Sequence, residues 1–397
     1  MGNEYKYTVE LKQETPMIHF QYDQNGACLR ASEVKPKLDK FIIKKNGNIP
    51  DNWYIDKSKK SALNYKMKII VKGTPQKSDT LNLFLEKKKN NDNKDKKNND
   101  NKYKTINSMY FGNMAKTEVE AIKNYKETVF YKDKIELDII CFIPELMCEI
   151  KKYLREFFAV NNFGTRQSKG FGGFSILEGK DVINELNSNN YEYFYVNTEI
   201  KDYRINLDIV DAIYALIKGG KNFSKINRNA YIKGYIQREY LNDIDKTNIG
   251  SDKAFIKAKG FFDNNENNYD DYFFVRALLG LAEKYEFKDD KRKGTITIEC
   301  ADKSVVRYKS PITVKIVDSY IFFIFENTFD QIRSKTFVFS RDDIKHKIKV
   351  PDTFDIDNFI TEFIEYFNEQ KNKFNEFNNK NYKLVARDDF ELIKGGK

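Results

Sequence analysis

The chain contains few of the residues on which metal centres and disulfide scaffolds depend. Its 397 residues include four cysteines, two histidines and one tryptophan. The cysteines form no CxxC pair, and their apolar or strand-like surroundings favour reduced, buried thiols over a zinc site. With only His19 and His346 present, the sequence also argues against a histidine-rich metal centre. We therefore expect no metal and no other cofactor.

Long apolar runs are also missing. No stretch approaches the roughly 18 consecutive apolar residues that a membrane-spanning helix needs. The first residues, MGNEYKYTVEL, show no signal-peptide pattern and lack the serine or threonine that N-myristoylation requires at the sixth position. We expect a cytoplasmic protein that has no membrane partner.

Positive charge, by contrast, is in excess. The chain has 69 Lys and Arg against 59 Asp and Glu, which gives a net charge of +10. This balance favours polyanionic partners such as RNA, DNA or acidic headgroups. The charge is segregated, because residues 350–379 hold seven acidic residues and two lysines, a net charge of −5. The polyanion-binding surface should therefore lie outside residues 350–379.

Hydrophobic periodicity predicts an α+β protein. Apolar and polar residues alternate from Tyr5 to Leu11, as in a half-buried strand. A helix follows that should begin close to Pro36, because proline fits only in the first turn. Tyr65–Val71 and Leu81–Leu85 alternate again and suggest a hairpin, and Ile135–Ile143 is a further predicted strand.

The first half completes a recognisable order of elements. Residues 145–158 place apolar side chains at helical spacing, and residues 174–176 suggest a strand. Strand, helix, strands, helix and strand predict a ferredoxin-like (RRM-like) domain over residues 1–185. Within it, residues 86–104 carry eight lysines and four acidic residues, with no apolar residue before Tyr103. Such a segment buries too little surface to offset its ordering entropy, so we expect a disordered insertion.

Residues 186–397 are predicted to form a second α+β, ferredoxin-like domain. Residues 208–218 and 229–240 have helical spacing, while residues 312–325 predict two strands joined by a turn at Asp318-Ser319. The domain should end in a long acidic amphipathic helix, with apolar residues recurring from Ile356 to Phe377.

A glycine-rich loop, NFGTRQSKGFGG, runs from Asn162 to Gly173. It is not a nucleotide P-loop, because Lys169 precedes Gly170 instead of following a glycine. It is also not a dinucleotide-binding fingerprint, because it follows a helix and leads into a strand, the reverse of the order in that motif. Its bare N–H groups beside Arg166 and Lys169 suit a phosphodiester chain, and Phe171 offers a ring for base stacking. The alternative is a tight turn that returns a helix onto a sheet.

Four stretches of the sequence resemble motifs of one family. Gly164–Gly172, of the form G-x-R-x-x-x-G-F-G between a helix and a strand, resembles the signature loop of the RAMP superfamily of CRISPR-associated RNA-binding proteins. Thr15-Pro16 with Leu29–Lys35 resembles the first motif of the family. Tyr110–Gly112 resembles its short FG element, and Arg307–Ile312 resembles an Arg-x-x-Ser-Pro stretch in the second half of family members. The chain is most similar to the two-domain RAMP subunits that cap type III-B (Cmr) effector complexes.

The resemblance implies two ferredoxin-like domains, other effector subunits as partners, and guide or target RNA held against the loop and the basic start of the first helix. Amide dipoles at a helix N-terminus favour phosphate as well. The candidate RNA-binding residues are Arg30, Lys35, Lys37, Gly164, Arg166, Lys169, Gly170, Phe171 and Gly172.

Residues 218–240 form another basic stretch, with six basic residues, one acidic residue and interleaved aromatic rings. This pattern suits single-stranded RNA. It adds the candidates Lys221, Lys225, Arg228, Tyr231 and Lys233. The alternative is a surface helix whose tyrosines bury against their own domain.

Catalysis is a competing hypothesis, because RAMP relatives include endoribonucleases that process guide RNA or cut target RNA. A general base must take the 2′-hydroxyl proton, and His19 is the candidate, while Asp23 is available to an acid-dependent mechanism. A third hypothesis is an assembly module that contacts other subunits through the acidic C-terminal helix. We favour a non-catalytic RNA-binding subunit of an antiviral effector complex.

Overall fold

The computed structural model describes most of the chain, and the elements below lie within the described residues. These are residues 5–17, 28–72, 76–77, 85–87, 103–105, 129–130, 135–219, 221–223, 226–228, 231–241, 249–259, 261, 271–289, 292–376 and 380–396.

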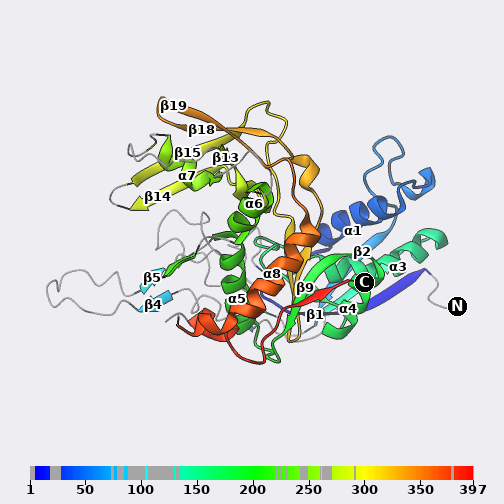
Figure 1. Ribbon diagram of the computed structural model, residues 1–397. Coiled ribbons are helices and arrows are strands. Elements are labelled where there is room, and N and C mark those ends of the chain that lie inside the picture. Colours follow the sequence, from blue (N-terminus) through cyan, green and yellow to red (C-terminus); the bar gives the residue numbers. More distant parts are fainter. Residues whose placement is uncertain are drawn as a thin grey trace, which may run out of the picture.

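Four strands of the first half form an antiparallel sheet in the order β2-β7-β1-β8 (Figure 1). Their bounds are β1 (Lys6–Gln13), β2 (Lys66–Val71), β7 (Ile135–Ile140) and β8 (Phe174–Ser175). Helix α1 (Ala31–Asn46) follows β1, helix α3 (Pro144–Val160) follows β7, and the two helices contact each other. Leu38, Leu137 and Phe157 are fully buried between the helices and the sheet.

Two local predictions in this half need correction. Strand β2 pairs with β7 rather than with the predicted hairpin partner, most of which lies outside the described residues. Helix α1 begins at Ala31, so Pro36 stands in its second turn. A proline in a helix interior costs about 3 kcal/mol. Burial of Val34, Leu38 and Ile42, at about 1.5–3 kcal/mol each, outweighs that cost.

The four-stranded sheet of the second half repeats the order of the first. Its strands β9 (Glu192–Asn197), β16 (Ile312–Val317), β17 (Tyr320–Phe325) and β20 (Ile393–Gly395) lie in the order β16-β17-β9-β20. In both halves the second, third, first and fourth strands therefore follow one another across an antiparallel sheet. Helix α5 (Tyr203–Tyr214) follows β9, and α8 (Ile356–Gln370) precedes β20. The predicted turn at Asp318-Ser319 is confirmed.

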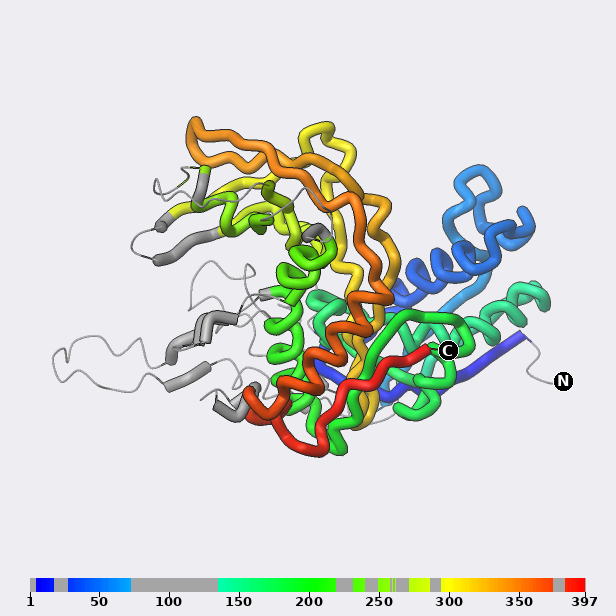
Figure 2. Tube along the Cα trace, viewed as in Figure 1, coloured from blue at the N-terminus to red at the C-terminus, as the bar shows by residue number. Residues whose placement is uncertain are grey.

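A six-stranded sheet is inserted into the second half, at the upper left of Figure 2, in the order β12-β13-β19-β18-β15-β14. Its strands are β12 (Ile249–Ser251), β13 (Asp271–Phe273), β14 (Lys284–Asp289), β15 (Arg292–Cys300), β18 (Thr336–Arg341) and β19 (Ile344–Lys349). Its inner face joins the large core that also contains α5 and α8. The α+β class is thus confirmed, and the six-stranded sheet is an addition that the sequence did not predict.

The remaining elements complete the description. In the first half they are η1 (Asp51–Trp53) and the strand pairs β3 (Gln76–Lys77) with β6 (Val129–Phe130) and β4 (Leu85–Lys87) with β5 (Tyr103–Thr105). Those in the second half are α4 (Gly179–Ser188), η3 (Ala215–Gly219), β10 (Lys221–Phe223), β11 (Ile226–Arg228), α6 (Tyr231–Leu241), α7 (Asp252–Ala258), η4 (Val275–Leu279), η5 (Phe329–Gln331), η6 (Lys371–Glu376) and α9 (Lys380–Val385).

Three predicted boundaries compare with these elements as follows. Both ends of the predicted disordered insertion lie in β4 and β5, whereas residues 88–102 lie outside the described residues. Helix α4 contains the predicted boundary at residue 185 and contacts both α3 and β20, so that boundary stays a prediction. Helix α8 ends at Gln370, where η6 continues the chain, so the acidic helix is shorter than predicted.

Candidate nucleic-acid interface

The glycine-rich loop lies where the two halves meet. Its C-terminal end is held by the segment after β1: Thr15 Oγ1 donates to the carbonyl of Gly170 at 2.7 Å and accepts from Gly173 N at 2.8 Å. Its start and its middle are held by β16 of the second half, because Asn162 Nδ2 donates to Val314 O at 2.7 Å and Val314 N donates to Ser168 O. Both halves therefore set the shape of the loop.

The second part of the loop is inside the protein. Gly170, Phe171 and Gly172 are buried, and the Phe171 ring belongs to the core of the second half. The amide of Gly172 donates to Pro16 O at 2.8 Å. The expectation that this part presents amides and a stacking ring to a ligand therefore needs correction, because the Gly172 amide and the Phe171 ring already have partners in the protein.

Glycine is required at position 172 for two reasons. Its φ of +67° lies in the left-handed region, and a Cβ there would stand 1.8 Å from Phe163 O. Gly164 (φ 79°) and Arg166 (φ 59°) also have positive φ. Thr165 to Lys169 remain half-buried, so the tip of the loop is the part that a ligand can reach.

Lys315, on β16, closes the base of the loop. Its ammonium donates to Asn161 O at 2.9 Å and to Phe174 O at 2.8 Å, the carbonyls at the two ends of the loop. The side chain is completely buried. Burial lowers the pKa of Lys315 to about 7, Glu14 opposes this shift, and Lys37 adds to it.

Lys37, on α1, reaches the loop from the other side. Its ammonium donates to Asn162 O at 2.7 Å and to the side chain of Gln167 at the tip. Burial, helped by repulsion from Lys309 and opposed by Glu33, lowers the pKa of Lys37 to about 8.

Lys169 and Lys218 extend the positive charge into the second half. The Lys169 ammonium lies 3.1 Å from the centroid of the Tyr214 ring. Burial, then repulsion from Lys218 and Arg166, lowers the pKa of Lys169 well below its ordinary value, and Asp211 opposes this shift. Lys218 donates to Leu279 O at 2.7 Å, and burial lowers its pKa to about 8.

We call this set the cationic cluster: Lys37, Arg166, Lys169, Lys218, Lys309 and Lys315. Lys315 is buried, and Lys37, Lys169 and Lys218 are half-buried. Among the described residues, no carboxylate forms an ion pair with the ammonium groups of these four lysines. Uncompensated buried charge is costly, and perturbed pKa values gather at functional sites. The cluster is therefore a candidate polyanion site.

Lys309 and Lys315 were not among the predicted RNA-binding residues. Lys309 and its neighbour Arg307 are exposed, in the Arg-x-x-Ser-Pro stretch that the family resemblance had marked. That stretch was the available signal for Lys309. Lys315 sits in an alternating strand as one lysine among many, and nothing in the sequence distinguishes it.

The other two predicted residues of α1 behave differently. Arg30 is half-buried and stands immediately before the helix, as predicted. Lys35 turns inward: its ammonium lies 2.8 Å from both Asp39 Oδ2 and Leu63 O, and 4.2 Å from the centroid of the Tyr65 ring. Lys35 is therefore part of the packing between α1 and the segment before β2.

The second basic stretch is only partly described. Lys221 and Arg228 lie in the paired strands β10 and β11, while Lys225 lies outside the described residues. The Tyr231 ring is buried against Phe359 and Phe363, so its face is taken by the protein, as the alternative to RNA stacking expected. Lys233 is half-buried, and burial lowers its pKa.

The candidate catalytic residues do not form a described site. His19 and Asp23 lie outside the described residues. His346, on β19, is half-buried, with its ring 5.5 Å from the centroid of the Phe261 ring. The described part of the chain holds no cluster of three or more residues able to bind a metal ion. Its helices include none with the length and apolar character to cross a membrane.

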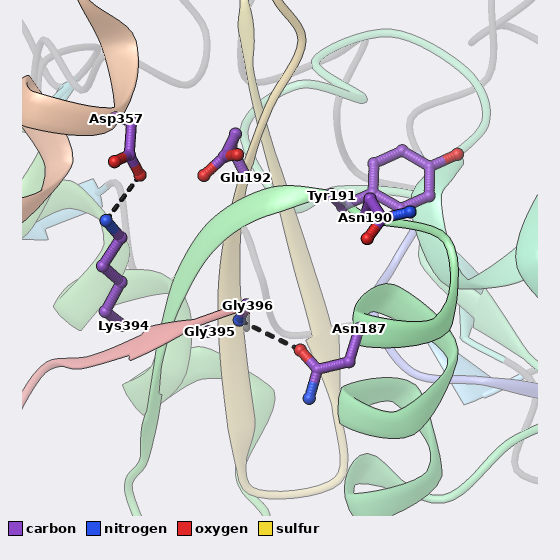
Figure 3. Close-up of a pocket in the computed structure, with 8 residues that line it drawn as sticks. All are labelled: Asn187, Asn190, Tyr191, Glu192, Asp357, Lys394, Gly395 and Gly396. Atoms are coloured by element: carbon purple, nitrogen blue, oxygen red, sulfur yellow. Dashed lines mark hydrogen bonds and ion pairs between the residues drawn. The ribbon is translucent and has the colours of Figure 1, made fainter.

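A polar pocket of about 400 Å³ lies elsewhere, beside the C-terminal strand (Figure 3). Its charged groups satisfy one another, because Lys394 forms an ion pair with Asp357 and the amide of Gly396 donates to Asn187 Oδ1 at 3.0 Å. It contains none of the predicted RNA-binding residues, and its paired charges leave no excess positive potential.

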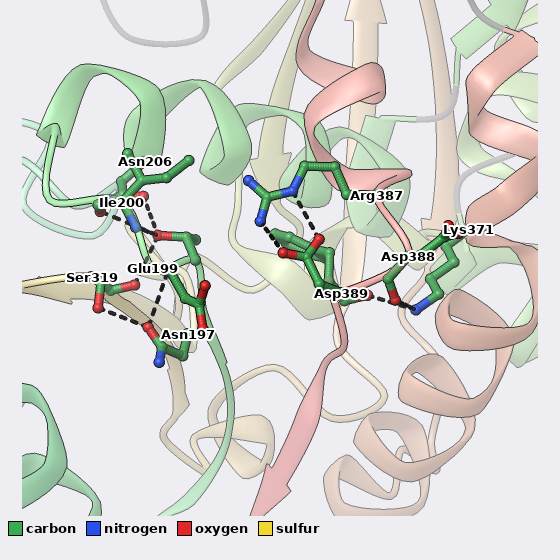
Figure 4. A network of polar contacts seen from close by, with 11 residues as sticks. Asn197, Glu199, Ile200, Asn206, Ser319, Lys371, Arg387, Asp388 and Asp389 are labelled. Atoms are coloured by element: carbon green, nitrogen blue, oxygen red, sulfur yellow. Dashed lines mark hydrogen bonds and ion pairs between the residues drawn. The ribbon is translucent and has the colours of Figure 1, made fainter.

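The repeated topology offers an internal comparison for the cationic cluster. In the second half, the segment between α8 and β20 takes the place of the glycine-rich loop and lies near the end of β9 (Figure 4). There Arg387 Nε donates to Asp389 at 2.9 Å, and Lys371 lies 3.5 Å from Glu391. At the start of α5, Arg204 Nη2 lies 2.8 Å from Asp202. Only the first-half position combines a glycine-rich loop with unpaired buried ammonium groups among the described residues.

Comparisons with known proteins agree with this arrangement. The family model described as Cmr1 N-terminal domain matches residues 4–221, more than half of the chain, and the Cmr1 C-terminal domain matches residues 231–384. The class is that of the RAMP subunits of Cmr complexes, as the motifs predicted. The chain belongs to the Cmr1 family.

Other comparisons add little. No curated protein sequence matches the chain. Among solved structures, it is similar to Cmr1 from Pyrococcus furiosus in its apo form, at 8% identity and a TM-score of 0.37, over 82% of this chain and 89% of that one. That likeness is too low to define the fold.

Proposed function

We propose that the chain is an RNA-binding subunit of a type III-B CRISPR effector complex and that it contacts the sugar–phosphate backbone of guide or target RNA at the cationic cluster. Arg166 at the loop tip, with Arg307 and Lys309 on the facing segment, makes the direct contacts. The buried ammonium groups behind them raise the local positive potential. Other subunits of the complex are the protein partners.

The single observation that carries this proposal is the convergence of ammonium groups from both halves on one loop, where none of them forms an ion pair with a described carboxylate. Lys37 comes from α1, Lys315 from β16 and Lys169 from the loop itself, and burial or mutual repulsion lowers the pKa of each. Phosphate groups would relieve that repulsion, and phosphate contacts dominate the affinity of proteins for nucleic acids.

The strand order supports a ferredoxin-like description of both halves, because each has the order second, third, first, fourth with a helix after the first and third strands. In this arrangement the loop before the fourth strand lies beside the end of the first strand. That geometry explains why Thr15 contacts the glycine-rich loop.

The test is the salt dependence of single-stranded RNA binding. The variant Arg166→Gln with Lys309→Gln should bind more weakly, and its plot of log K against log salt should be less steep by about 1.4, since each lost phosphate contact removes about 0.7. The matched control is Arg204→Gln with Arg387→Gln, which removes the same charge from two arginines of the second half that have acidic partners, and it should keep the wild-type slope.

Equal slopes for the two variants would contradict the proposal. An absence of salt-dependent RNA binding by the wild-type chain would favour the assembly-module hypothesis instead. Cleavage of bound RNA that is lost in His19→Ala, with binding kept, would favour the endoribonuclease hypothesis.

A further inference from the structure

The outer face of the inserted sheet carries a row of lysines that the proposed RNA site does not use. Lys345, Lys347 and Lys349 alternate along β19 and are all exposed, while the residues between them face inward. His346, for example, points toward the Phe261 ring. Alternate residues of a strand are about 6.8 Å apart, so the three ammonium groups form a regular line. In Figure 1, β19 lies at the upper margin of the molecule.

Hydroxyl groups accompany the lysines on the neighbouring strands. The cross-strand partners of Lys349 and Lys345 on β18 are Thr336 and Ser340, and Ser340 in turn faces Thr297 on β15. Lysine ammonium and hydroxyl groups are the donors that proteins use toward phosphate oxygens. No aromatic residue occupies a described, exposed position on this face of β15, β18 or β19, so it offers no platform for base stacking.

The balance of charge on this face is positive. Among the described residues of the three strands, Glu299 is the exposed carboxylate on this side, two strands away from Lys347. Lys349 lies 3.9 Å from Asp352, at the limit of an ion pair, and no ion pair of Lys345 or Lys347 is found within the described residues. The other exposed carboxylates stand at the two ends of the row, with Asp342 and Asp343 in the turn before it and Asp352 after it. The lysines between these ends, Lys345 and Lys347, are complementary to a polyanion.

We propose that this face, which we call the β19 face (Lys345, Lys347, Lys349, Thr336 and Ser340), binds the phosphate backbone of a nucleic acid strand without reading its sequence. The surface belongs to the inserted sheet and is separate from the cationic cluster, so the proposal does not rest on the cluster being an RNA site. Lysines also protect exposed strands from aggregation, and β19 pairs with β13 only at Lys349, so the test must separate the two roles.

The experiment measures binding of a single-stranded RNA of mixed sequence to the full chain across a range of salt concentrations. The triple variant Lys345→Gln, Lys347→Gln and Lys349→Gln should lose three phosphate contacts. Because each contact contributes about 0.7, the slope of log K against log salt should become less steep by about 2. The matched control replaces Lys57, Lys59 and Lys60, three exposed lysines after η1, with glutamine and should leave the slope unchanged. Arginine at the three β19 positions should restore the wild-type slope.

Three outcomes would overturn the inference. The β19 variant would match the control in slope and affinity if an acidic protein, rather than a nucleic acid, covers this face. It would aggregate but bind RNA normally as a monomer if the lysines only protect the sheet edge. A changed slope that differs between RNA sequences would show sequence reading rather than backbone contact.

Discussion

Replacement of Lys315 by methionine tests how the base of the glycine-rich loop is held. The substitution keeps the length of the side chain but removes both hydrogen bonds to the carbonyls of Asn161 and Phe174. The deprotonated amine of Lys315 still has two hydrogens to donate to these two carbonyls, whereas the methionine side chain has no hydrogen-bond donor. The comparison therefore separates the hydrogen bonds of Lys315 from its charge.

The magnitude follows from the pKa. Lys315 has a pKa of about 7 in the fold and 10.5 ordinarily, and each pKa unit corresponds to about 1.4 kcal/mol, so the charged form costs the fold about 5 kcal/mol. Because the unfolded chain binds this proton more tightly, stability rises with pH between about 7 and 10.5, and the cost is fully present below pH 7. The orphaned carbonyls of Lys315→Met cost about 1–3 kcal/mol each at every pH.

The variant should therefore be less stable than wild type by about 2–6 kcal/mol near pH 10 and close to wild type near pH 6. Urea unfolding at both pH values, followed by the fluorescence of Trp53, the single tryptophan, measures the difference. Replacement of the exposed Lys66 by methionine is the control. A destabilisation that stays constant from pH 6 to pH 10 would refute the assignment of a lowered pKa to Lys315.

Two further predictions concern the loop and its charge. Gly172→Ala should cost several kcal/mol in unfolding free energy, because its Cβ would collide with Phe163 O. The control Gly47→Ala, at φ +68° with open space around it, should cost about 1 kcal/mol. Similar losses of stability for the two variants in thermal denaturation would contradict the close approach at Gly172. RNA affinity should fall as pH rises above about 8, because bound phosphate raises the lowered pKa of Lys37 and binding then takes up a proton. Calorimetry in buffers of different ionisation enthalpy should detect that proton near pH 9, and its absence in wild type would exclude Lys37 from the site.

The sequence was most informative where a single periodicity determines an element. The alternation of β1, the apolar stripe of α3 and the turn at Asp318-Ser319 all appear as predicted, because local pattern and burial agree there. Strand pairing was less accessible: β2 has the same alternation whichever strand lies beside it, and its partner β7 comes more than 60 residues later.

The candidate site was predicted in part, for a physical reason. The glycines of the loop signal an unusual backbone conformation, and that signal was correct at Gly170 and Gly172. A positive φ does not reveal the surroundings, so the burial of Phe171 against the second half could not be foreseen. In the same way, Lys35 and Lys37 are alike in sequence, yet one packs inward and the other reaches the loop.

The most direct test of the central claim is photo-crosslinking of RNA from a defined position beside the cationic cluster. A photoreactive amino acid at Val306, an 84% exposed side chain next to Arg307, should crosslink to bound RNA. The same group at Ile55, 63% exposed on the segment after η1, is the matched control and should give little product. Crosslinks from Ile55 equal to or stronger than those from Val306 would contradict the proposed path of the RNA.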